Sequence, residues 1–138
     1  MPLKFPPKLG QLLICDFDKG GFLPPEMVKR RPAVVVSPRL RSRTLITTVV
    51  PLSTTPPDPP EPFVVELNFD EPLAKRFRAT TMWAKCDMIA AVSLARLDLF
   101  RVGTDAQTGK RRYSDRTLSP QEFAAVRAGI IAAIGEVR

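Results

Sequence analysis

Two short runs of β-branched and other apolar residues, bounded by prolines, restrict the fold of this chain most strongly. They cover residues 33–37 and 45–52, and Pro32, Pro38 and Pro51 lie at or near their ends. Valine and isoleucine favour strands, whereas proline cannot donate to a ladder of hydrogen bonds. The two runs therefore predict a pair of buried strands with defined ends.

The segment between these runs is long enough to join them as a hairpin. In an antiparallel pair, the start of the first strand lies beside the end of the second strand. Arg31 precedes the first run, and Ser53 and Thr54 follow the second. We therefore expect a guanidinium group and a hydroxyl group to meet at one edge of the sheet.

Further strands are predicted at residues 11–17, 63–67, 80–86 and 87–92, where short apolar segments alternate with connections rich in proline and glycine. Two cysteines, Cys15 and Cys86, lie inside apolar segments without the spacing of a zinc site. We expect both to be reduced core residues.

A C-terminal helix is predicted with defined ends. Ser119 and Glu122 form a capping box, Pro120 occupies the first helical position, and Gly135 closes the helix. Apolar residues follow at steps of three and four, which predicts one buried stripe formed by Phe123, Val126, Ile130 and Ile134.

Many short strands followed by one helix predict a mainly β fold, with a small, strongly curved antiparallel sheet of the SH3-like β-barrel type. The length of 138 residues fits a single domain, 1–138. Residues 101–116 are glycine-rich and basic, and we expect them to form an inserted loop or hairpin within that domain.

The composition restricts the function. The formal charge of +7 and the pI of about 10.0 predict an anionic partner, either nucleic acid or an acidic protein. The chain has no histidine, which excludes Ser-His-Asp and Cys-His nucleophilic sites and histidine-bound zinc. Neither a secretory signal nor an apolar run of membrane-spanning length is visible, so we expect a cytoplasmic protein.

The string Arg-Pro-Ala-Val-Val-Val-Ser-Pro at 31–38, followed by Val-Pro-Leu-Ser-Thr at 50–54, resembles the PemK/MazF toxins of bacterial toxin–antitoxin modules. Further matching segments lie at 10–17 and 87–89, at Arg96-Leu97 and at the end of the predicted helix. The resemblance covers nearly the whole chain, but residues 101–116 depart from the family pattern.

The resemblance implies a type II toxin that acts as a sequence-specific, metal-independent endoribonuclease without a cofactor. It also implies a homodimer and a cognate acidic antitoxin, with which the toxin binds DNA. The family's catalytic arginine corresponds to Arg31, and its catalytic threonine corresponds to Ser53, with Thr54 as a substitute. Asp87 matches the family's Asp-Gln pair, but Met88 replaces the amide.

The implied chemistry suits these residues. RNA carries its own nucleophile, the 2′-hydroxyl group, so an enzyme can cleave it by positioning the phosphodiester and stabilising the developing charge. Arginine stays protonated and binds phosphate with two parallel hydrogen bonds. The resemblance further implies cleavage of single-stranded RNA to a 2′,3′-cyclic phosphate or 3′-phosphate end and a 5′-hydroxyl end.

Substrate binding requires further contacts. Basic residues are expected to line an RNA groove: Lys29, Arg30, Arg39, Arg41, Arg43, Lys75, Arg76 and Arg78. Asp87 is a candidate for reading bases. Phe22, Trp83 and Tyr113 are candidates for stacking on bases.

Two other functions fit the same residues. A catalytically silent SH3-like module would bind nucleic acid or a protein, and Arg31 and Ser53 would then be structural. A toxin of the CcdB type would bind gyrase, although the Arg-Pro and Ser-Thr motifs support this function less well.

Overall fold

The computed structural model describes residues 2–18 and 21–135. The strands are β1 (Leu12–Asp16), β2 (Arg30–Val35), β3 (Ile46–Ser53), β4 (Val64–Asn68), β5 (Thr81–Lys85), β6 (Ala90–Ser93), β7 (Leu97–Asp98), β8 (Arg101–Thr104) and β9 (Arg111–Tyr113). Two short 3-10 helices, η1 (Cys86–Met88) and η2 (Leu94–Arg96), flank β6, and helix α1 (Pro120–Ile134) ends the chain.

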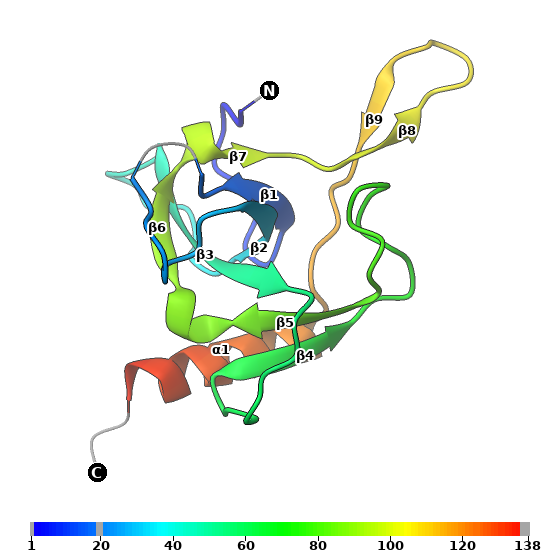
Figure 1. Ribbon diagram of the computed structural model, residues 1–138. Coiled ribbons are helices and arrows are strands. Elements are labelled where there is room, and N and C mark those ends of the chain that lie inside the picture. The colour runs from blue at the N-terminus through cyan, green and yellow to red at the C-terminus, as the bar shows by residue number, and fades with distance from the viewer. Residues whose placement is uncertain (1, 19–20, 136–138) are drawn as a thin grey trace.

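Seven strands of the described residues form one antiparallel sheet with the order β4-β5-β3-β2-β1-β7, and β6 also pairs with β3 (Figure 1). β8 and β9 form a separate two-stranded sheet. This arrangement confirms the predicted mainly β fold with one C-terminal helix. The sheet is curved, but its path is open at β4 and β7 and does not close into a barrel.

The predicted hairpin of β2 and β3 is confirmed. Its register pairs Ala33 with Pro51, Val34 with Val50 and Val35 with Val49. β2 begins earlier than the sequence predicts because β1 pairs with its first residues, Asp16 opposite Arg30. The last two residues of β3 leave this ladder and pair with β5 instead.

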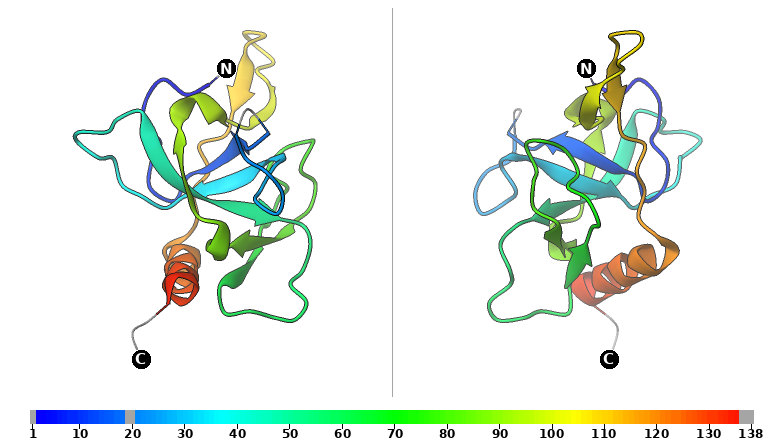
Figure 2. Two further views of the ribbon diagram at one scale, coloured as in Figure 1. Left: turned by 60° about the vertical axis from the view of Figure 1, so that its left-hand side comes forward. Right: turned by 90° about the vertical axis from the view of Figure 1, so that its right-hand side faces the viewer.

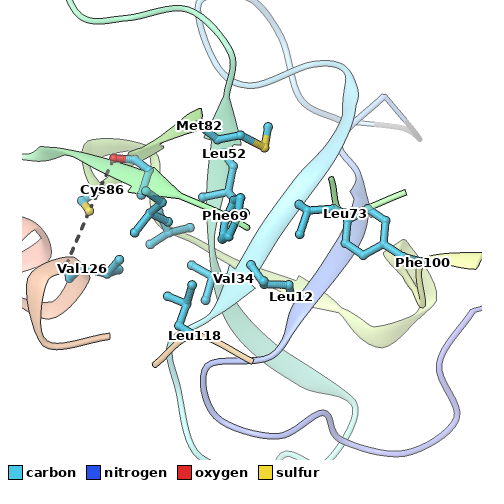
Figure 3. Close-up of a cluster of buried hydrophobic side chains, with 13 residues drawn as sticks. Leu12, Val34, Leu52, Phe69, Leu73, Met82, Cys86, Phe100, Leu118 and Val126 are labelled. Carbon is cyan, nitrogen blue, oxygen red and sulfur yellow. Dashed lines mark hydrogen bonds between the residues drawn. The ribbon is translucent and has the colours of Figure 1, made fainter. Parts of the chain in front are cut away.

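Opposite faces of the sheet bury two separate apolar clusters, because side chains alternate along each strand. The first cluster contains Leu12, Val34 and Leu52, and Figure 3 shows it beside α1. The second cluster contains Ala33 and Val35, the neighbours of Val34 in β2. β2 therefore contributes to both cores.

Helix α1 begins as predicted. The Ser119 side chain accepts a hydrogen bond from the Glu122 backbone N–H, and the Glu122 side chain accepts one from the Ser119 N–H. Val126 is fully buried, and the Cys86 thiol donates to its carbonyl oxygen at 3.6 Å (Figure 3). The prediction that Ile134 belongs to the buried stripe is wrong: it is 71% exposed, because the last turn of α1 extends beyond the sheet (Figure 1).

The other predicted elements need two refinements. The apolar segment at 87–92 is not one strand, because η1 occupies its start and β6 begins only at Ala90. Residues 101–116 contain a hairpin of β8 and β9, which projects from the end of the molecule opposite to α1 (Figures 1 and 2).

Close packing between α1 and the sheet predicts that Gly129→Ala destabilises the protein. A Cβ atom at this position would lie 2.8 Å from both the Cys86 Sγ atom and the Val65 Cγ2 atom. Such overpacking costs about 1–3 kcal/mol, and because two contacts are this short we expect the cost to exceed the gain of about 1 kcal/mol in helix propensity. We expect a lower thermal midpoint by calorimetry. Ala128→Ser, at an exposed neighbour, should change stability by less than about 0.5 kcal/mol, and an unchanged Gly129→Ala midpoint would contradict the packing argument.

Both cysteines are free and fully buried, as predicted. Burial raises the pKa of each thiol from 9.0 to about 12. Between pH 9 and 12 the unfolded chain loses these protons while the folded protein retains them, so the free energy of unfolding falls as pH rises, by at most about 1.4 kcal/mol per pH unit for each thiol. We expect the free energy of unfolding, measured with urea, to fall more steeply between about pH 9 and 11 in the native sequence than in Cys15→Ala. Equal slopes would contradict this.

Candidate functional site

Arg31 lies in β2, opposite Cys15 of β1. Strand alternation places its half-buried side chain on the same face as Ala33 and Val35. Within residues 2–18 and 21–135, its Nε atom is the buried side-chain polar atom without a hydrogen-bond partner. A buried donor in this state costs about 1–3 kcal/mol. Because buried polar groups in native folds are normally paired, this donor needs an explanation, and a catalytic role is one of those that apply.

Ser53 is the nearest hydroxyl-bearing position on β3. The β2–β3 ladder ends at the pair of Ala33 and Pro51. Arg31 lies two residues before this pair in β2, and Ser53 lies two residues after it in β3. Ser53 is only 5% exposed, and its Oγ atom accepts a hydrogen bond of 3.1 Å from the Thr55 backbone N–H. This bond fixes the oxygen and leaves the hydroxyl proton to be donated elsewhere.

Thr54, the alternative hydroxyl, is exposed. The ladder partner of Ser53 on its other side is Trp83 of β5, a half-buried residue. The arginine and the serine singled out in the sequence thus lie on two adjacent strands, near the point where β3 passes from β2 to β5.

Arg30 precedes Arg31 and its side chain lies on the opposite face of β2. Its Nη2 atom lies 3.7 Å from the Asp98 Oδ2 atom. Together with Lys75 and Arg76, Arg30 lines a pocket. Three of the predicted RNA-binding side chains therefore meet in one place. Lys29, which is exposed, directly precedes Arg30 in the sequence.

The structure does not bring the remaining predicted RNA-binding residues to the same place. Arg39, Arg41 and Arg43 are exposed in the connection between β2 and β3. That connection lies at the far end of the hairpin from Ser53 (Figure 2, left). Asp87 is exposed in η1, and the Arg78 Nε atom donates to the Lys75 carbonyl oxygen at 3.4 Å.

The aromatic candidates also differ in their surroundings. The Phe22 ring packs edge-on against Phe17 with centroids 5.4 Å apart, and the guanidinium of Arg96 lies 5.0 Å from the Phe22 centroid. Arg96 also donates to the Asp16 carbonyl oxygen at 3.1 Å. The sequence identified Arg96 only as a family marker, so this bridging role between distant parts of the chain was missed. Tyr113 is 46% exposed on β9.

The described part of the chain shows neither a cluster of metal ligands nor a membrane-spanning helix. No group of three or more Cys, Asp or Glu side chains within residues 2–18 and 21–135 could hold a metal ion. No helix in these ranges is long and apolar enough to cross a membrane.

Two related sequences match most of the chain. An uncharacterized protein of Escherichia coli (strain K12), YifN, is 27% identical over 154 residues, which span 99% of this chain and 97% of the relative. An uncharacterized protein of Haemophilus influenzae is 32% identical over 101 residues, which span 66% of this chain and 68% of that protein.

Solved structures share the fold. An endoribonuclease from a mycobacterial species, solved in complex with its cognate antitoxin, aligns with a TM-score of 0.61 at 21% identity and covers 93% of this chain and 94% of its own. The family model of the PemK-like, MazF-like toxins of type II toxin–antitoxin systems matches residues 8–134. Because this match spans nearly the entire chain, the protein belongs to the PemK/MazF toxin family.

Proposed function

We propose that this toxin is a metal-independent endoribonuclease that cleaves single-stranded RNA at preferred sequences. The observation that carries the proposal is the unpartnered, buried Nε atom of Arg31 in β2, with the hydroxyl group of Ser53 at the end of the adjacent strand β3. Family membership supports the same activity. One protein of the same fold is an endoribonuclease.

Arg31 binds the scissile phosphate in this proposal. A guanidinium group suits this role, because it remains charged at any relevant pH and presents parallel N–H donors to two phosphate oxygens. The negative charge on these oxygens increases as the 2′-oxygen attacks phosphorus. A donor that lacks a protein partner stabilises this charge without first losing an existing hydrogen bond.

Ser53 positions the same phosphate. Its oxygen already accepts the Thr55 N–H, so its own O–H can donate to a phosphate oxygen. The P–O2′ bond forms while the P–O5′ bond breaks. The 2′-hydroxyl group loses one proton and the leaving 5′-oxygen gains one, which gives 2′,3′-cyclic phosphate and 5′-hydroxyl ends.

We further propose an acidic antitoxin as partner and a homodimer as the working assembly. The net charge of +7 favours an acidic polypeptide as well as RNA. A protein with the same fold was solved in complex with its cognate antitoxin. An acidic, disordered segment that folds on binding would compete with RNA for the same cationic groups.

Replacing Arg31 tests the catalytic proposal. We expect Arg31→Ala to lower the cleavage rate by about 10²–10³, the usual loss when one donor to a transition-state oxyanion is removed. Arg31→Lys should retain part of the rate, because it keeps the charge but not the paired donors. The measurement is cleavage of a long single-stranded RNA in EDTA, with the new ends mapped.

Circular dichroism should verify that both Arg31 variants are folded. RNA that remains intact with the folded native sequence would refute the endoribonuclease proposal and favour a silent binding module. Cuts that persist at the native rate in folded Arg31→Ala would refute the role of Arg31 alone.

The two adjacent hydroxyl residues provide a matched comparison. We expect Ser53→Ala to slow cleavage about tenfold or more, because a hydrogen bond of about 1.4 kcal/mol to the transition state is lost. Thr54→Ala should retain the native rate within about twofold, since Thr54 is exposed. Single-turnover cleavage rates of the two variants on the same RNA check both expectations. The reverse ranking would assign the catalytic hydroxyl to Thr54.

A further inference from the structure

A pocket of about 750 Å³ lies beneath the β8–β9 hairpin, on the face of the sheet opposite to Arg31. Its floor comes from Ile14 of β1, Arg30 of β2 and Asp98 of β7. One wall is the segment 74–77, and the other is the hairpin with Leu99 before it. The volume lies within the range of about 300–1,000 Å³ that is typical of sites for small ligands.

One face of the hairpin is turned towards this pocket. Arg101 pairs with Tyr113 and Thr104 pairs with Arg111, and all four residues line the pocket. Directly paired residues of an antiparallel ladder share a face. Arg112, which lies between Arg111 and Tyr113, is exposed and does not line the pocket. The hairpin therefore directs one arginine of its Arg-Arg-Tyr sequence inwards and the other outwards.

Hydrogen bonds near the base of both walls hold them in place. The Ser114 N–H donates to the Phe100 carbonyl oxygen at 2.8 Å, which closes the base of the hairpin. The Arg116 Nη1 atom donates to the Glu71 carbonyl oxygen at 2.8 Å, which ties the chain after the hairpin to the opposite wall. Phe77 packs edge-on against Phe100 with centroids 5.6 Å apart.

The chemistry of the lining indicates a nucleotide. Five cationic side chains and one carboxylate line the pocket; the cations are Arg30, Lys75, Arg76, Arg101 and Arg111. The carboxylate, Asp98, lies beside Arg30. Tyr113 presents a half-exposed aromatic ring among these charges. Cationic groups for phosphates beside an aromatic ring for a base are the combination that binds single-stranded nucleic acid.

We propose that this pocket is a second RNA-binding subsite, in which Tyr113 stacks on a base and Arg101 and Arg111 hold the adjacent phosphates. The inference rests on the proposed function and extends it: the base bound here flanks the cleaved linkage. Arg30 and Arg31 are consecutive in β2, so one strand end connects the pocket to the proposed catalytic arginine. A strand of RNA can therefore contact both sites.

RNA fits this pocket better than an acidic polypeptide does. Acidic segments that fold on binding are usually anchored by apolar side chains in an apolar groove. Here the apolar lining residues Ile14, Phe77 and Leu99 are half-buried, and most lining residues carry charged or hydroxyl groups. Planar guanidinium groups next to an exposed ring suit bases and phosphates.

The test measures binding without cleavage. The probe is a fluorescent single-stranded RNA of random sequence, about 15 nucleotides long to match the span of known single-strand sites, with 2′-O-methyl groups that remove the attacking hydroxyl. Fluorescence anisotropy at several salt concentrations gives the dissociation constant for the native sequence, Tyr113→Ala, Tyr113→Phe and Arg111→Ala. Arg112→Ala is the matched control, because it removes the same charge from the outer face of the same hairpin.

We expect Tyr113→Ala to weaken binding about five- to hundredfold, while Tyr113→Phe, which retains the ring, stays within about twofold. Arg111→Ala should weaken binding and lower the salt slope by about 0.7, whereas Arg112→Ala should resemble the native sequence. These exposed substitutions should leave the thermal midpoint unchanged. The inference is overturned if the dissociation constants of Arg111→Ala and Tyr113→Ala equal that of Arg112→Ala.

Two further measurements distinguish a failure of this inference from a failure of the proposed function. If poly-L-glutamate binding depends on Arg111 while oligonucleotide binding does not, the pocket serves an acidic polypeptide and the inference is overturned. Cleavage of unmodified RNA is measured on the same preparations. If the native protein binds RNA through Tyr113 but does not cleave it, the proposed function is refuted and the subsite is retained. If the protein cleaves RNA but its binding does not depend on Tyr113 or Arg111, the subsite is refuted and the proposed function is retained.

Discussion

The site depends on the way β3 leaves β2 at Pro51. Neither Pro32 nor Pro51 has a backbone N–H, so a regular ladder between the two strands cannot continue through them. Beyond Pro51, Leu52 and Ser53 pair with β5. Arg31 therefore retains its neighbour Cys15 on the β1 side but has no ladder partner on the β3 side. The divergence that allows one sheet to curve around two cores therefore falls close to both Arg31 and Ser53 in the chain.

The same strand end serves two faces of the sheet. Because side chains alternate, the Arg30-Arg31 pair supplies one guanidinium to the pocket under the hairpin and one to the face with Ser53. Short strands suit this arrangement, since a few residues at a strand end lie close to both faces and to the loops around them. The β8–β9 hairpin then adds a wall on one side only, and it leaves the face that carries Arg31 unchanged.

The parts that the sequence predicted correctly depend on local signals. Proline boundaries and β-branched runs predicted the central hairpin, and the Ser-Pro-Gln-Glu string predicted the start of α1. The predicted groove was less accurate because it grouped arginines by composition: Arg39, Arg41 and Arg43 lie at the closed end of the hairpin. The pocket requires residues 74–77 to meet 101–113, and a nonlocal hydrogen bond from Arg116 to Glu71 helps to hold these segments together. No local sequence pattern indicates such a bond.

A buried donor without a partner has a cost, so its persistence needs a structural reason. Arg31 is held from the β1 side through Cys15, which is fully buried, and its neighbours Ala33 and Val35 are fixed in the second core. The side chain is thus restricted by its strand while its Nε atom stays unsatisfied. A phosphate oxygen arriving there would gain a hydrogen bond without displacing another, and the ordering of the guanidinium would already have occurred during folding. The stability lost in the free protein is then recovered as binding energy at the atom where negative charge develops.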